Sequence, residues 1–74
     1  MSKPLIERDP EILGGTAVFA GTRVPIRILF EHLEAGDRLD DFLENYPTVT
    51  RDQAVLLLER AARSLAKSGD EAAA

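Results

Sequence analysis

Apolar residues recur every three to four positions over most of the chain after residue 25, which is the period of an α-helix. The first such stripe predicts a helix at about residues 26–35, because Gly36 is a natural stop. The second predicts a short helix at about residues 39–46, which Pro47 ends. The apolar faces of these helices contain Ile26, Leu29, Phe30 and Leu33 in the first, and Leu39, Phe42, Leu43 and Tyr46 in the second.

A third helix is expected at about residues 51–67, where Thr50 and Gln53 have the spacing of a capping box. One side of this helix is apolar over roughly half its circumference. It contains Ala54, Leu57, Leu58, Ala61, Ala62 and Leu65, with Val55 and Ala66 beside them. Two interpretations stay open. Either the whole arc faces the domain's own core, or part of it is buried against a second chain.

The residues before the helices favour a small β element. Residues 4–8 can form a short edge strand, residues 9–15 form a turn, and residues 16–25 predict two short strands around Ala20-Gly21. Pro25 suits the first turn of the following helix. The expected fold is therefore mainly α, with a small N-terminal β-hairpin followed by three helices. The second and third helices are compatible with a helix-turn-helix. We expect residues 1–68 to form the single domain and residues 69–74 to form a flexible tail.

Length and composition limit the ways in which this domain can be stabilised. The chain has 74 residues, no cysteine and one histidine. A domain of this size buries a modest core, so packing and partners must replace disulfides or a zinc site. We expect no metal and no cofactor. No apolar run reaches the length of a membrane helix, and the charged N-terminus does not match a signal peptide. We therefore expect a cytoplasmic protein.

The charge is acidic overall but uneven. The net charge is −4, with four bases and three acids in residues 1–30 and five bases and ten acids after them. This balance disfavours broad, non-specific coating of nucleic acid. A helix-turn-helix would read DNA with the start of its second helix, which here holds Thr50, Arg51 and Gln53. However, Asp52 lies among these residues and would repel phosphate.

A stripe with three bases runs along the other side of the third helix. It contains Gln53, Leu56, Arg60, Arg63 and Lys67. One interpretation is that the bases suit the negative end of the helix dipole and keep the exposed side soluble. The functional interpretation is contact with phosphate or with an acidic partner. The candidate residues for partner binding are Leu56, Arg60, Arg63, Leu65 and Lys67.

No residue pattern predicts an enzyme. His32 is the single histidine and is expected to be an ordinary boundary residue. The glycine-rich stretch lacks the phosphate-binding loop motif. Helical spacing spreads Asp37, Asp40, Asp41 and Glu44 over a solvated face rather than gathering them around a metal.

Residues 5–62 resemble a small bacterial and archaeal family catalogued as domain of unknown function 433. The resemblance is carried by Asp9-Pro10, Gly14-Gly15, Val18-Phe19, Gly21-Thr22-Arg23-Val24-Pro25-Ile26, Gly36, Tyr46-Pro47, Thr50 and Ala61-Ala62. Two positions depart from the family pattern. Thr16-Ala17 replaces the usual Lys-Pro, and Arg38 replaces a frequent Ser cap, which leaves Asp37 as the expected cap of the second helix.

The resemblance implies a homeodomain-like or winged fold and the role of an antitoxin in a type II toxin–antitoxin module. Such an antitoxin looks like VapB-type proteins: it binds a PIN-like nuclease toxin, dimerises and represses its own promoter. Under this hypothesis Arg23 and Arg27 join Arg51 and Gln53 as candidates for DNA contact. An alternative role for Arg23 is to tie the hairpin to the body through Asp9 or Glu11. The alternative function is a protein-binding adaptor that does not touch DNA.

Overall fold

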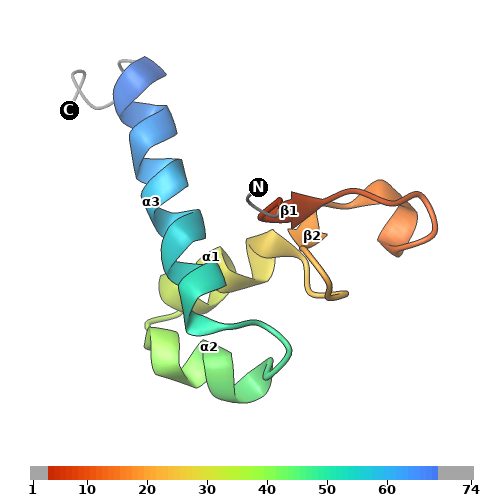
Figure 1. The fold of residues 1–74 in the computed structure, drawn as a ribbon. Coiled ribbons are helices and arrows are strands. Elements are labelled where there is room, and N and C mark those ends of the chain that lie inside the picture. The colour runs from red at the N-terminus through yellow and green to blue at the C-terminus, as the bar shows by residue number, and fades with distance from the viewer. Residues whose placement is uncertain (1–3, 69–74) are drawn as a thin grey trace.

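Figure 1 shows the computed structural model of the chain, which describes residues 4–68. Two short antiparallel strands come first, β1 (Ile6–Glu7) and β2 (Val18–Phe19), joined through a 3-10 turn, η1 (Leu13–Gly15). Three helices follow, α1 (Ile26–Glu34), α2 (Leu39–Asn45) and α3 (Arg51–Ser68). The prediction of a mainly helical fold with an N-terminal hairpin is confirmed. The tail predicted at residues 69–74 lies outside the described residues.

The hairpin pairs its strands differently from the prediction. The partner of β2 is β1, with Ile6 opposite Phe19, and the segment after Gly21 adds an isolated bridge between Val18 and Pro25. Pro25 has no N–H with which to extend a ladder. The turn is instead held by the buried Thr22, whose hydroxyl donates to the Phe19 carbonyl at 2.8 Å and accepts from the Val24 N–H at 3.1 Å.

The ends of α1 and α2 follow local signals in the sequence, with one exception. Gly36 has a φ of +90° and ends α1, because glycine adopts this conformation at little cost. The N-cap of α2 is Arg38 and not the expected Asp37. The Asp41 carboxylate accepts the Arg38 N–H at 2.9 Å, whereas the Asp37 carboxylate contacts Nδ1 of His32 at 2.8 Å. Asp37 is therefore engaged with α1 and cannot cap α2.

The core lies between the hairpin and the three helices. Its buried apolar side chains are Leu5, Ala17, Val18, Phe19, Val24, Leu29, Phe42, Val49, Ala54 and Leu57. Phe42 is the centre of an aromatic group, with ring centroids 6.1 Å from Phe19, 5.2 Å from Tyr46 and 5.6 Å from His32. These contacts join the hairpin, α1 and α2, so one small core supports all the elements that precede α3.

Only the first half of α3 takes part in this core. Ala54 and Leu57 are buried and Leu58 is half-buried, but no described residue after Leu57 is fully buried. Figure 1 shows the second half of α3 projecting beyond the other elements. Within residues 4–68, no helix combines the length and the apolar character that a membrane crossing requires.

Candidate functional site

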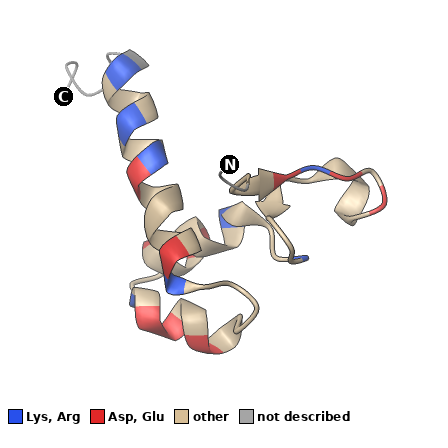
Figure 2. Ribbon diagram, viewed as in Figure 1, with Lys and Arg blue, Asp and Glu red and all other residues tan. Residues whose placement is uncertain are grey.

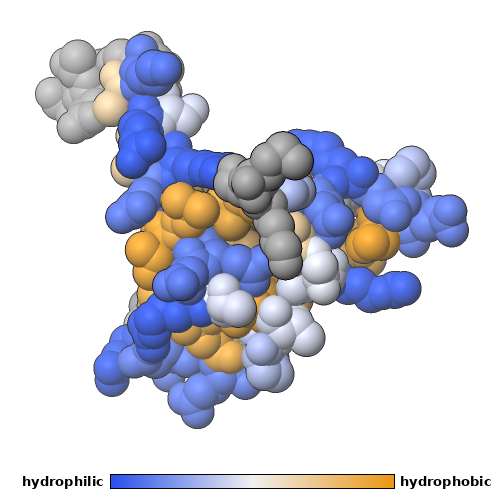
Figure 3. All heavy atoms as spheres, viewed as in Figure 1, coloured by the Kyte–Doolittle hydropathy of each residue, from blue (hydrophilic) through white to orange (hydrophobic). Residues whose placement is uncertain are grey.

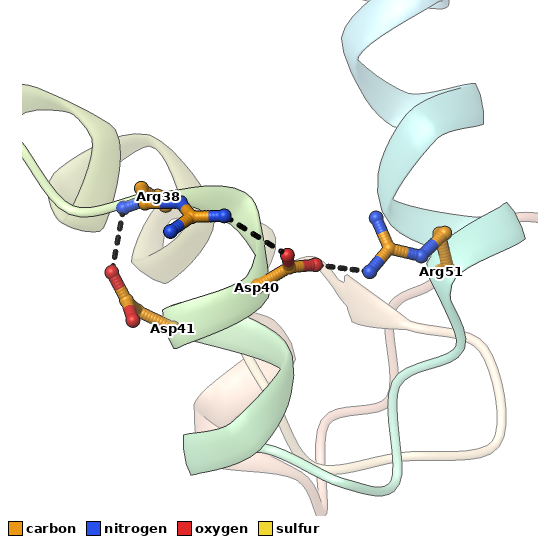
Figure 4. A network of polar contacts seen from close by, with 4 residues as sticks. All are labelled: Arg38, Asp40, Asp41 and Arg51. Carbon is orange, nitrogen blue, oxygen red and sulfur yellow. Dashed lines mark hydrogen bonds and ion pairs between the residues drawn. The ribbon is translucent and has the colours of Figure 1, made fainter.

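The start of α3 is fixed to α2 by a network of charged groups, drawn in Figure 4. The Arg51 guanidinium on α3 donates to the Asp40 carboxylate on α2, and the Arg38 guanidinium approaches the same carboxylate at 3.5 Å. The hydrogen bond from Arg51 and its positive charge hold the pKa of Asp40 below its ordinary value. Arg51 therefore has an acidic partner in the place where the sequence predicts a DNA contact.

Gln53 connects the start of α3 to the hairpin. Its side-chain oxygen accepts the Thr50 N–H at 3.0 Å, and the Thr50 hydroxyl accepts the Gln53 N–H at 3.1 Å. The predicted capping box is thereby confirmed. The other end of the Gln53 amide donates to the Ala20 carbonyl in the hairpin turn at 3.0 Å. Both polar ends of Gln53 are occupied within the domain.

The remaining arginines predicted for DNA contact lie on other elements. Arg27 is exposed on α1 and donates to Glu31 at 2.8 Å, as the i,i+4 spacing predicts. Arg23 is exposed in the turn after β2, and among residues 4–68 it makes no hydrogen bond or ion pair. The contact considered between Arg23 and Asp9 or Glu11 is therefore not formed.

Acidic residues surround the start of α3. Asp40, Asp41 and Glu44 are exposed on α2, and Asp52 is exposed in the first turn of α3. Figure 2 shows acidic residues along α2 and at the base of α3, and basic residues along the projecting half of α3. Phosphate groups approaching the start of α3 would meet these acids, whereas an electropositive partner would be attracted to them.

The five residues predicted for partner binding divide between two sides of α3. Leu56 and Leu65 are nine positions apart, which is about 180° around a helix that turns by about 100° per residue. Arg60, Arg63 and Lys67 lie on the side of Leu56, within about 40° of it by the same period. Leu65 instead continues the line of Ala54, Leu58 and Ala61, which begins in the core. Both Leu56 and Leu65 are exposed.

Residues 6–59 match the family described as "Protein of unknown function (DUF433)". The chain belongs to the DUF433 family. The matched residues run from the first strand of the hairpin into the middle of α3, so they include nearly all of the buried core. The projecting half of α3, from Arg60 onward, lies beyond the part of the chain that defines membership of DUF433.

One relative of this DUF433 chain is "Uncharacterized protein y4eO" from Sinorhizobium fredii (strain NBRC 101917 / NGR234), which is 33% identical over 52 residues. The similar region covers 70% of this chain and 24% of the relative, so the chain matches about a quarter of the relative's length. No solved structure matches the chain significantly.

Two features of this DUF433 domain leave no signal in the sequence. His32 is held by Asp37 and by edge-on contacts with Phe42 and Tyr46, at centroid distances of 5.6 and 5.8 Å. A groove of about 550 Å³ also lies between the hairpin and the start of α3, beside the Gln53–Ala20 contact. It is lined by Pro4, Leu5, Glu7, Ala20, Gly21, Thr50, Asp52, Gln53 and Leu56. Among the described residues, no group of three His, Asp or Glu side chains could hold a metal ion.

Proposed function

We propose that this DUF433 chain is the antitoxin of a type II toxin–antitoxin module and acts by capturing a partner protein with the projecting half of α3. The observation that carries the proposal is the exposed continuation of the core stripe along this half, from Leu58 to Leu65. Within residues 4–68, no buried residue follows Leu57, so the core of the domain does not extend along this half. Apolar helix faces of this kind bind in grooves of other proteins, with anchors at i, i+3, i+4 and i+7.

The partner implied by the resemblance is a PIN-like nuclease. A nuclease active site must attract a polyanion, so its surroundings carry positive potential. The exposed acids of α2, Asp40, Asp41 and Glu44, offer a complementary surface. These acids lie at the base of α3, at the end opposite to its projecting half (Figure 2), so they would compete with the substrate of a nuclease that reaches along the whole of α3.

The test is binding of the purified chain to the purified product of the adjacent gene, measured by isothermal titration calorimetry. Leu65→Asp places a charge in the proposed interface and is expected to weaken binding by at least about a hundredfold, as for an anchor at the centre of an interface. Leu13→Asp is the matched control, because Leu13 is 57% exposed and Leu65 is 54% exposed, but Leu13 lies in η1. Equal binding by both variants would contradict the proposal, and so would absence of binding by the unmodified chain.

Repression of the chain's own promoter is the second candidate function. It is supported by the order α2, turn, α3 and by the exposed Arg23, which makes no ion pair within residues 4–68. Two observations argue against it. Arg51 and Gln53 are hydrogen-bonded to Asp40 and to the Ala20 carbonyl, and acidic residues lie beside them.

Fluorescence anisotropy with DNA from the upstream region, titrated with salt, separates the two functions. Specific binding that weakens steeply with salt and with Arg23→Ala supports repression. Binding no tighter than to unrelated DNA leaves partner capture alone, which is the function of an adaptor that does not touch DNA.

A further inference from the structure

The groove between the hairpin and the start of α3 has an apolar lining and an acidic rim. Its apolar surface comes from Pro4, Leu5, Ala20 and Leu56. Leu56 is 38% exposed, so part of this surface is open to an occupant. Figure 3 shows apolar atoms around the base of α3 with hydrophilic atoms beside them. The volume of about 550 Å³ lies within the range of sites that bind ligands, and it has room for a few side chains.

The rim carries two carboxylates, one from each side of the groove. Glu7 lies on β1, and its Oε1 accepts the Gly21 N–H at 2.7 Å, which holds this carboxylate against the hairpin turn. Asp52 lies in the first turn of α3, and within residues 4–68 its side chain makes no hydrogen bond or ion pair. Both carboxylates therefore keep oxygen atoms that can accept hydrogen bonds from an occupant.

No base offsets these two charges at the groove. Among the described residues that line it, none is a lysine or an arginine. Arg51 precedes Asp52 in the sequence, but its guanidinium donates to Asp40 on α2. The rim is consequently a local site of negative potential beside exposed apolar surface, and it attracts a cationic occupant.

The charges along α3 determine where a cation can lie. Arg60 is one turn beyond Leu56 on the same side of the helix, and the bases of the projecting half continue from there (Figure 2). They repel a cation, which is therefore favoured between Asp52 and the hairpin. An arginine or lysine side chain suits this end of the groove because it combines an apolar stem with a charged head. An aliphatic neighbour of that residue would cover Leu56.

We propose that the groove docks a short segment of a partner protein in which an arginine or a lysine stands next to an aliphatic residue. The basic head lies at the rim formed by Glu7 and Asp52, and the aliphatic side chain packs on Leu56. Arginine is favoured over lysine, because a guanidinium can form paired hydrogen bonds with a carboxylate. Leu65 lies about 180° from Leu56 around α3, so this docking does not depend on the proposed capture by the Leu65 side. Leu65→Asp is expected to leave it unchanged.

An NMR titration of the isotope-labelled full chain with synthetic peptides at low salt tests the docking. The probe is acetyl-Ser-Leu-Arg-Val-Ser-amide, and two control peptides replace either its arginine with glutamine or both of its aliphatic residues with serine. The probe is expected to bind with a dissociation constant of about 1 mM or tighter. It is expected to shift the amide signals of Ala20, Gly21, Gln53 and Leu56, which line the groove. Each control peptide is expected to bind more weakly by at least about threefold.

Substitutions at the rim test the role of the two carboxylates. Asp52→Asn and Glu7→Gln remove a charge with little change of shape, and in the second the new amide oxygen can still accept the Gly21 N–H. Each is expected to weaken binding of the probe by about threefold, and the two together by about tenfold. Glu44→Gln, at an exposed acid on α2 outside the groove, is the matched control and is expected to bind as the unmodified chain does. The amide spectrum of each variant also shows whether it is folded.

Three results would overturn the proposal. The first is the absence of shifts at the groove up to about 10 mM probe. The second is equal binding of the glutamine peptide, or equal weakening by Glu44→Gln, because the groove would then not recognise the charge. The third is movement of the groove amides when the chain without peptide is diluted, because a second copy would then occupy the groove instead of a partner segment.

Discussion

The Arg51 guanidinium, in the first turn of α3, donates a hydrogen bond to the Asp40 carboxylate on α2. The two partners are eleven positions apart in the sequence, and the turn at residues 46–50 lies between their helices. The contact joins the first turn of α3 to α2 on the exposed side of the domain. The buried Ala54 and Leu57 pack the same half of α3 into the core.

This pair predicts a small, acid-sensitive contribution to stability. The pKa of Asp40 is lowered from 3.8 by Arg51, so the folded state holds the ionised form more tightly than the unfolded chain does. The contribution is present above about pH 4 and is lost as the pH falls through the lowered pKa. We expect the melting temperature of the unmodified chain to exceed that of Arg51→Gln by a constant amount from pH 5 to 7, and by less below pH 4.

Arg23→Gln is the matched control for this pH series, because Arg23 is exposed without an ion-pair partner within residues 4–68. The difference between Arg51→Gln and the unmodified chain is also expected to shrink at high salt, as for other exposed pairs. Parallel pH profiles for Arg51→Gln and the unmodified chain would show that the pair does not contribute.

Gln53 is expected to stabilise the domain beyond its role as a capping residue. Gln53→Ala removes the acceptor for the Thr50 N–H and the donor to the Ala20 carbonyl, for a cost of about 1–2 kcal/mol in the free energy of unfolding. Chemical denaturation measures this cost. Glu59→Ala, at an exposed position on the same helix, is expected to stay within about 0.5 kcal/mol of the unmodified chain. If the two variants were equally stable, the hydrogen bonds of Gln53 would contribute nothing to the free energy of unfolding.

Removal of the Phe42 ring is expected to destabilise the fold strongly. Phe42→Ala removes a fully buried ring that contacts Phe19, Tyr46 and His32, at a cost of about 3–5 kcal/mol. A domain of this size has little stability beyond that, so we expect a largely unfolded chain in far-ultraviolet circular dichroism. Phe42→Leu keeps most of the apolar volume and is expected to fold with a lower melting temperature. A cooperative melt of Phe42→Ala near the unmodified temperature would contradict this description of the core.

Gly36 is expected to contribute to stability only through its backbone conformation. Its φ is +90°, and a Cβ built at this position meets no atom within 4 Å, so a side chain causes strain but no clash. Gly36→Ala is expected to cost about 1–2 kcal/mol in the free energy of unfolding. Gly36→Asn is expected to cost less, since asparagine tolerates left-handed conformations better. Equal stability of the two variants in thermal melts would argue against this explanation of how α1 ends.

The sequence predicts those parts of the fold that local chemistry determines. Gly36 and Pro47 end helices because of their own backbone properties, and the capping box of Thr50 and Gln53 joins residues three positions apart. The stripes that include Leu29 and Phe42 mark buried faces through helical periodicity alone. The prediction that Asp37 caps α2 was wrong, because its carboxylate contacts His32 on α1 in the folded domain.

The contacts of the candidate site could not be predicted from the sequence, because they join residues that are far apart along the chain. Gln53 reaches Ala20 across 33 positions, and Arg51 reaches Asp40 across the turn between two helices. Neither contact changes the spacing of apolar residues, so neither leaves a periodic signal. The sequence identifies Arg51 and Gln53 as residue types able to contact DNA bases. It does not predict that Asp40 and the Ala20 carbonyl are hydrogen-bonded to them within the domain. Similarly, periodicity marks the apolar side of α3 but not the residue at which the domain stops covering it.

Hydrogen exchange on α3, with and without the purified product of the adjacent gene, tests the proposed capture most directly. In the free chain, the amides of residues 59–67 are expected to exchange faster than those of residues 54–58, because no described residue of α3 after Leu57 is buried in the core. In the complex, residues 59–67 are expected to become the most strongly slowed segment, while exchange in α1 stays unchanged. Slowing confined to the hairpin or α1, with residues 59–67 as fast as in the free chain, would contradict capture by α3.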